Sequence, residues 1–190
     1  MAGKPPRPDG NRRKPGTVTD RLRTLARYNA WANHHLYAAA AALPDEQYRA
    51  DRGAFFKSVN GTLNHLLATD RIWMQRFTGE GPRPDRLDAI LFDDLSSLHA
   101  ARQVEDTRIV SYVDGLEHAA LAETFTYARI SSPERYEHQL GPALDHFFNH
   151  QTHHRGQVHA VLTGLGAAAP SLDLILFHRE VGFGGMKRIA

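Results

Sequence analysis

The chain has 190 residues, of which 42% are hydrophobic and 23% are charged, and it contains no cysteine. This composition is typical of a globular domain with a substantial hydrophobic core. The absence of cysteine excludes disulfides, thiolate metal ligands and a cysteine nucleophile. We find no apolar run of about 18 residues, which a membrane-spanning helix would need, and no hydrophobic signal segment at the start. We therefore expect a cytoplasmic protein with no membrane partner.

The positive charge is concentrated at the start of the chain. The segment MAGKPPRPDGNRRKPG contains five basic residues and one acidic residue, whereas the whole chain has a net charge of +2. Proline, glycine and charge dominate this segment, so we expect residues 1–16 to form a disordered basic tail. One domain is expected over residues 17–190. We do not expect that domain to bind nucleic acid, and binding through the tail is the lowest-ranked of our functional hypotheses.

Two helices are expected in the first half of the chain. Thr19 or Asp20 can cap the first, and apolar residues then recur at a helical period until Pro44 interrupts the pattern. Ser58 precedes a second periodic segment, which closes at Gly79. Both segments are long enough to form bundle helices.

The next part of the chain combines a third helix with a hairpin. Residues 81–94 are expected to form a loop with some local helix, and the third helix is predicted from about 96 to 121 with Val104 among its inward residues. The segments 124–130 and 135–140 alternate in polarity around a turn-like SSPE, which predicts a β-hairpin.

A fourth helix is predicted from Pro142, a favoured first-turn residue, to about Gly164. Four helices of about 20 residues with short connections are typical of an antiparallel bundle. The predicted fold class is therefore all-α, a four-helix bundle with a short β-hairpin inserted between the third and fourth helices.

The fourth helix carries the sequence NHQTHHRGQ at residues 149–157. At 100° per residue, His150 and His154 lie on the inward-facing side of the helix, whereas His153 faces water. Imidazoles four residues apart can reach one cation, but this spacing is also frequent by chance. The alternative is that both histidines lie at the edge of the core and bond to the backbone or to each other.

The neighbouring residues exclude two common metal sites. A zinc-protease HExxH motif needs a glutamate at position 151, which is Gln. A di-iron bundle needs inward glutamates, but position 147 is Phe and position 62 is Thr. A mononuclear site rich in histidine remains. It needs a ligand from another helix, and His65 is the best-placed candidate, although it lies well off the centre of its own apolar stripe.

Three motifs together resemble those of the DinB-like proteins, a family distinct from the DNA polymerase of the same name. They are YNxWAN at residues 28–33, TLNHLLATDxxW at 62–73 and HxxxHRGQ at 150–157. The likeness covers most of residues 20–178, keeps the motif order and includes Phe56 and Ser58 before the second helix. Each motif alone is weak evidence for the family, but three motifs in this order and at these spacings are a specific match.

The resemblance implies a four-helix bundle, often dimeric, that binds a divalent metal through three histidines. Carried over position by position, the ligands are His65, His150 and His154. Imidazole ligands suit several metals, so we expect one divalent ion, zinc or nickel first and iron as a further option. A homodimer is the expected assembly.

The wider superfamily includes thiol-dependent S-transferases and isomerases. A cation held by three neutral imidazoles keeps its charge and its open positions, and it acidifies a bound thiol or water. Because this chain has no cysteine, the thiol would be a low-molecular-weight cosubstrate. We therefore expect a metal-dependent enzyme that acts on small molecules, either thiol S-transferase-like or hydrolase-like. The alternative is a non-catalytic, stress-related dimeric protein in which the metal is structural.

Three further residues near the histidines have alternative roles. Arg155 can bind a substrate carboxylate, but we favour an ion pair with Asp70 across the bundle. Gln151 faces the core and can support a metal ligand through a hydrogen bond or simply pack. Gly156 is expected to permit close helix packing.

Overall fold

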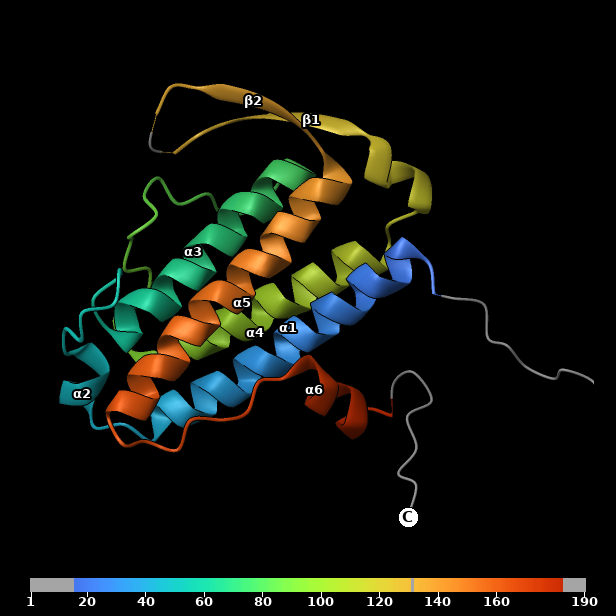
Figure 1. The fold of residues 1–190 in the computed structure, drawn as a ribbon. Coiled ribbons are helices and arrows are strands. Elements are labelled where there is room, and N and C mark those ends of the chain that lie inside the picture. The colour runs from blue at the N-terminus through green and yellow to red at the C-terminus, as the bar shows by residue number, and fades with distance from the viewer. Residues whose placement is uncertain (1–15, 131, 183–190) are drawn as a thin grey trace, which may run out of the picture.

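The structure is a computed structural model, and it describes residues 16–130 and 132–182. The tail expected over residues 1–16 lies outside the described residues except for Gly16. Four long helices lie side by side in a bundle (Figure 1): α1 (Val18–Ala41), α3 (Val59–Thr78), α4 (Leu95–Asp114) and α5 (Leu140–Gly164). The predicted fold class is confirmed. None of the helices in the described residues combines the length and the hydropathy that a membrane span needs.

The predicted hairpin is also present between α4 and α5. Strands β1 (Thr124–Ala128) and β2 (Arg135–Gln139) pair antiparallel, with Tyr127 opposite Tyr136. The hairpin lies across one end of the bundle (Figure 1) and is anchored there by Arg76 of α3. The Arg76 guanidinium lies 4.5 Å from the Trp73 ring and 4.3 Å from the Tyr127 ring, and it donates a hydrogen bond to the carbonyl of Ala128. Cation–π contacts of this kind stabilise partly buried sites.

The caps define the helix boundaries. Thr17, not Thr19 or Asp20, is the N-cap of α1, and its hydroxyl accepts from the backbone N–H of Asp20 in a capping box. Ser58 caps α3 as predicted, and Gly79 ends it in the left-handed conformation with φ 75°. These caps satisfy backbone groups that have no partner within the helix.

Two predictions for the third helix were wrong. It ends at Asp114 rather than near residue 121, because Gly115 has low helix propensity, and a 3₁₀ helix, η1 (His118–Ala122), follows. Val104 is 69% exposed rather than inward. The inward positions of α4 include buried charged residues, among them Arg102 and Asp106, and this polar interior obscured the apolar stripe.

The connections also differ from the prediction. No helix forms at residues 81–94, where local helix was expected. Short helices that we did not predict lie at α2 (Asp45–Arg49) and α6 (Leu174–Glu180). Within the apolar run LDLILF at residues 172–177, α6 begins at Leu174, and its Phe177 is buried against Tyr28.

The bundle interior has a polar layer between two apolar clusters. One cluster, nearer the hairpin, includes Met74, Ile109 and Phe147. The other includes Leu36 and Leu63 near the opposite end of the bundle. The sequence segments between these clusters supply the buried polar residues, which form the sites described next.

Candidate metal centre

Three histidine side chains meet between α3 and α5, which pack against each other. His65 comes from α3, and His150 and His154 come from successive turns of α5. The Nε2 atom of His65 lies 3.2 Å from Nε2 of His154 and 3.4 Å from Nε2 of His150. The structure therefore brings together the three residues predicted from the sequence, and we call them the histidine centre.

The position of His65 is explained by the burial of its helix. All residues from Thr62 to Asp70 are buried, because α3 packs against both α4 and α5. The loop that follows α3 covers a further side, where the backbone N–H groups of Leu91 and Phe92 donate to the side chain of Asn64. A helix buried on several sides has no single inward direction, so an off-stripe residue can still face the interior. His65 is only 3% exposed.

Hydrogen bonds on the outer side of two rings determine which nitrogens face the centre. The Nδ1 atom of His65 lies 2.6 Å from the carbonyl oxygen of Leu87, which can only accept, so this nitrogen carries the proton. The Nδ1 atom of His154 likewise donates to Oε1 of Gln157 at 2.7 Å. In a neutral imidazole the second nitrogen is then an unprotonated acceptor. Two lone pairs therefore face each other at 3.2 Å with no proton between them.

Burial keeps the three rings in their neutral form. It lowers the pKa of His65 to about 4, although the bond to Leu87 opposes this shift. Burial lowers the pKa of His150 to about 3, with further lowering by the neighbouring histidines. The pKa of His154 is also lowered, mainly by burial. Neutral imidazole is the form that ligates metal ions.

A tight turn from Ala54 to Lys57 covers one side of the histidine centre. The N–H of Lys57 donates to the carbonyl of Ala54 at 2.7 Å, and Lys57 has φ 67°, which is unfavourable for a residue with a side chain. The turn stacks the Phe56 ring on His65, with centroids 3.6 Å apart and planes inclined by 17°. Gly61 makes room for this turn, since a Cβ at position 61 would overlap with the Phe56 carbonyl oxygen.

The geometry of the histidine centre fits a transition-metal ion. Lone pairs that repel one another become ligands when a cation lies between them, and nitrogen donors of this kind suit zinc, nickel and iron. Three protein ligands leave coordination positions open. His150 is only partly buried, so its side of the histidine centre is the most exposed to solvent. His153 is exposed, as predicted.

Three residues that shape the centre were missed by the sequence analysis. Gln157 follows His154 by three residues on one helix, and that spacing could have identified it. Gly61 could have been noticed as a glycine in the first turn of a helix. Leu87 contributes a backbone carbonyl from a distant loop, and no side-chain pattern reveals such a contact.

A second polar cluster lies deeper in the bundle, and we call it the buried ion network: Asn29, Asn33, Asp70, Arg102, Asp106 and Arg155. Arg102 pairs with Asp70 at 2.6 Å and with Asp106 at 3.1 Å. Burial raises the pKa of Asp70 to about 7, against the opposing effect of Arg102, so ionisation of this carboxyl group depends on the guanidinium. Each charged group of the network thus has a partner on another residue.

The network corrects the predicted partner of Arg155. Its guanidinium donates to the side-chain oxygens of Asn29 and Asn33, whereas the ion-pair partner of Asp70 is Arg102. Gln151 donates to Asp70 and to the carbonyl of Leu66, so it supports the network rather than a histidine. The sequence pattern could not distinguish these partners, because all of these residues face the same interior.

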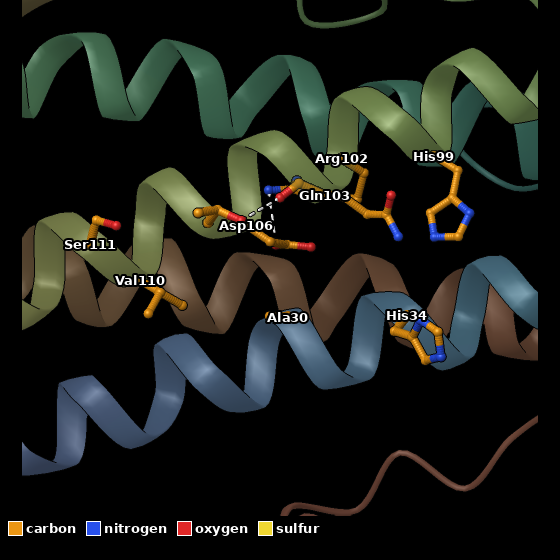
Figure 2. Close-up of a pocket in the computed structure, with 9 residues that line it drawn as sticks. Ala30, His34, His99, Arg102, Gln103, Asp106, Val110 and Ser111 are labelled. Atoms are coloured by element: carbon orange, nitrogen blue, oxygen red, sulfur yellow. Dashed lines mark hydrogen bonds and ion pairs between the residues drawn. The ribbon is translucent and has the colours of Figure 1, made fainter.

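A pocket of about 370 Å³ opens above the network between α1 and α4. Figure 2 shows His34 and His99 at one end of it, with Arg102 and Asp106 along its length. Among the described residues that line the pocket, Arg102 and Asp106 are the only Arg, Lys, Asp or Glu residues. They pair with each other. The pocket therefore offers no unpaired charge to a ligand.

Fold and site together define a class: a helical bundle with three neutral histidines converging between two of its helices. The family model described as the DinB family matches residues 16–182. The chain belongs to the DinB family.

Individual relatives agree with this assignment. The chain is 26% identical over 160 residues to Protein DinB of Bacillus subtilis (strain 168), covering 80% of this chain and 91% of that protein. The crystal structure of a DinB-like protein from Bacillus cereus ATCC 10987 is similar in fold, with a TM-score of 0.56 and 16% identity. That likeness covers 74% of this chain and 90% of the other.

Proposed function

We propose that this DinB-family protein binds one divalent metal ion, zinc or nickel first, through His65, His150 and His154. We further propose that it uses the ion to act on small molecules. The favoured reaction transfers the sulfur of a small thiol to an electrophilic carbon, and the second candidate is hydrolysis. In the transfer, the thiol loses its proton to solvent, and the new C–S bond of the thiolate replaces the bond to a leaving group, which departs with its electron pair.

One observation carries this proposal. The Nε2 atoms of His65 and His154 lie 3.2 Å apart, and both are unprotonated because their Nδ1 atoms donate elsewhere. Two buried acceptors at this distance have no favourable interaction unless a cation lies between them. The alternative left open by the sequence was that His150 and His154 bond to the backbone or to each other. Among the described residues, no hydrogen bond joins these two rings or links either of them to a backbone group.

The chain's own residues supply binding and shielding. When bound, the ion would acidify a thiol or water at an open coordination position. The three neutral imidazoles leave its charge undiminished, and Phe56 shields the His65 side from water. Since the chain has no cysteine, the sulfur comes from a cosubstrate.

The first test is elemental analysis of protein purified without a histidine tag and then incubated with zinc or nickel. We expect close to one ion per chain in the wild type and in His153→Ala, which removes an exposed neighbour on the same helix. His154→Ala should lose the ion. Full metal content in His154→Ala would refute the ligand assignment, and absence of metal in the wild type would refute the proposal itself.

A second test addresses catalysis. Metal-loaded protein is assayed with glutathione and chlorodinitrobenzene for thiol transfer, and with nitrophenyl acetate for hydrolysis. We expect turnover that follows metal content across wild type, His153→Ala and His154→Ala. Metal binding that raises the melting temperature without turnover would instead support a structural ion.

A further inference from the structure

A groove with a volume of about 410 Å³ lies between the C-terminal half of α5 and the residues just before the Ala54–Lys57 turn. Its walls are mainly apolar or small, with Ala54 on one side and Ala160, Val161 and Leu165 on the other. A volume of this size is within the range of small-molecule sites. The mainly apolar walls favour a ligand with an apolar body.

Arg52 is the single charged residue among the described residues that line this groove. It is exposed, and no described side chain or carbonyl accepts a hydrogen bond from its guanidinium. Nearby Arg49, in contrast, is paired with both Asp45 and Asp93. A free guanidinium beside apolar walls favours a planar anion such as a carboxylate, which it can bind through two parallel hydrogen bonds.

Small residues leave the groove face of α5 open. Ala160 and Gly164 line the groove and lie four residues apart, so they share one face of the helix, and Gly156 precedes them by one turn. A Cβ added at Gly156 or Gly164 would meet no described atom within 4 Å apart from the neighbouring residues and the backbone of its own helix turn. The expected packing role of Gly156 is therefore absent within the described chain. The two glycines are not explained by contacts within the chain, although they weaken a helix.

The groove adjoins the histidine centre through two shared elements. Gln157 lines the groove while its Oε1 atom accepts from Nδ1 of His154. On the other side, the carbonyl of Lys57 accepts from the backbone N–H of Arg52 at 2.8 Å, which joins Arg52 to the turn that stacks Phe56 on His65. A ligand in the groove thus contacts residues that position two of the three histidines.

We propose that this groove binds a small organic carboxylate with an apolar body and that Arg52 binds its carboxylate group. The inference rests on the proposed function, since it assigns the substrate class of the same centre. The carboxylate belongs either to the electrophilic substrate or to the thiol cosubstrate, and both present the same group to Arg52.

The test uses fluorine NMR of para-trifluoromethylbenzoate, with the corresponding benzamide as a neutral probe, added to full-length metal-loaded protein. We expect the benzoate to bind wild type more tightly than the amide. Arg52→Gln should weaken benzoate binding about tenfold and abolish the preference, because a hydrogen bond to a charged group is lost. Arg21→Gln replaces an exposed arginine on α1 and should leave benzoate binding and the preference for it unchanged.

A second variant tests the shape of the groove. Gly164→Leu places a side chain into open space, so we expect unchanged folding by circular dichroism and loss of binding of both probes. Benzoate binding that is unaltered in Arg52→Gln or in Gly164→Leu would overturn the proposal. So would the absence of benzoate binding to wild type at concentrations up to about 10 mM.

Two further measurements separate the related hypotheses. If the carboxylate belongs to the thiol, mercaptoacetate displaces the benzoate at lower concentration than propionate does; if it belongs to the electrophile, the two acids displace it equally. Metal content is measured on the same samples. Metal without carboxylate binding refutes only this inference, whereas carboxylate binding without metal refutes only the proposed function.

Discussion

The histidine centre and the buried ion network are both polar clusters inside one bundle, but they differ in how their groups are satisfied. In the network, Arg102 lies between two carboxylates, and the asparagines bond to the remaining charges. In the histidine centre, two acceptors face each other across 3.2 Å. The charged groups of the first cluster thus have partners within the chain, whereas in the second two acceptors face each other without a hydrogen between them.

This difference indicates which polar residues of a bundle are structural. Buried charges that pair with one another on different helices fix the helices relative to one another, although such pairs add little net stability. Buried neutral groups that converge as acceptors, with no donor between them, indicate a site for a ligand. The comparison can be tested by variants that affect one cluster and leave the other intact.

The largest effect is expected from breaking the network. Arg102→Met leaves Asp70 and Asp106 without their counter-charge, and it should lower the free energy of unfolding by about 3–5 kcal/mol. Urea unfolding of the metal-free protein measures this change. Arg86→Ala, which removes an exposed ion pair with Asp88, should change stability by less than about 1 kcal/mol. A loss in Arg102→Met as small as this would show that the network is dispensable.

Metal addition should have the next largest effect. Zinc or nickel at a hundred times its dissociation constant should stabilise the wild type by about 2.7 kcal/mol, because it binds the folded state. Thermal unfolding with and without metal measures this gain. The stabilisation by metal should be absent in His65→Ala. Arg102→Met should keep it, provided that this variant folds. An equal gain in His65→Ala would mean that the ion binds elsewhere.

A smaller effect is expected at Gln157, which orients one histidine. Gln157→Leu removes the acceptor for Nδ1 of His154 and should weaken metal binding about 10- to 100-fold, with little change in metal-free stability. Competition with a chromogenic chelator measures the affinity. His153→Ala removes the other group in contact with Gln157 and is the matched control. Equal affinity in the two variants would exclude an orienting role.

The smallest effects on stability are expected when alanine replaces Gly61 or Gly156. Gly61→Ala should lower stability by about 1–3 kcal/mol, since its methyl group overlaps with the carbonyl of Phe56 and displaces the turn. Gly156→Ala adds a methyl group in open space and should raise stability by up to about 1 kcal/mol. Chemical unfolding of both variants measures the sign of each change in the free energy of unfolding. Unchanged or raised stability in Gly61→Ala would show that the turn does not press on α3.

Much of the fold could be predicted because it depends on local signals. Apolar periodicity, Ser58 and Gly79 identified α3, and alternation around a turn identified the hairpin. The prediction failed where polar residues occupy inward positions, as on α4. Arg102 and Asp106 interrupt the apolar stripe there, and Val104, predicted to face inward, is exposed. The partner of Asp70 could not be chosen, because several cations face one interior.

By itself the sequence determined the helical bundle, its hairpin and the common face of His150 and His154, because these follow from spacing along one chain segment. Only the tertiary structure decided that His65 meets them, which lone pairs face the centre, and that the carbonyl of Leu87 and the Phe56 ring complete the surroundings of His65. Spacing along a helix specifies a direction about its axis. The distance between atoms on different helices depends on how the whole bundle packs.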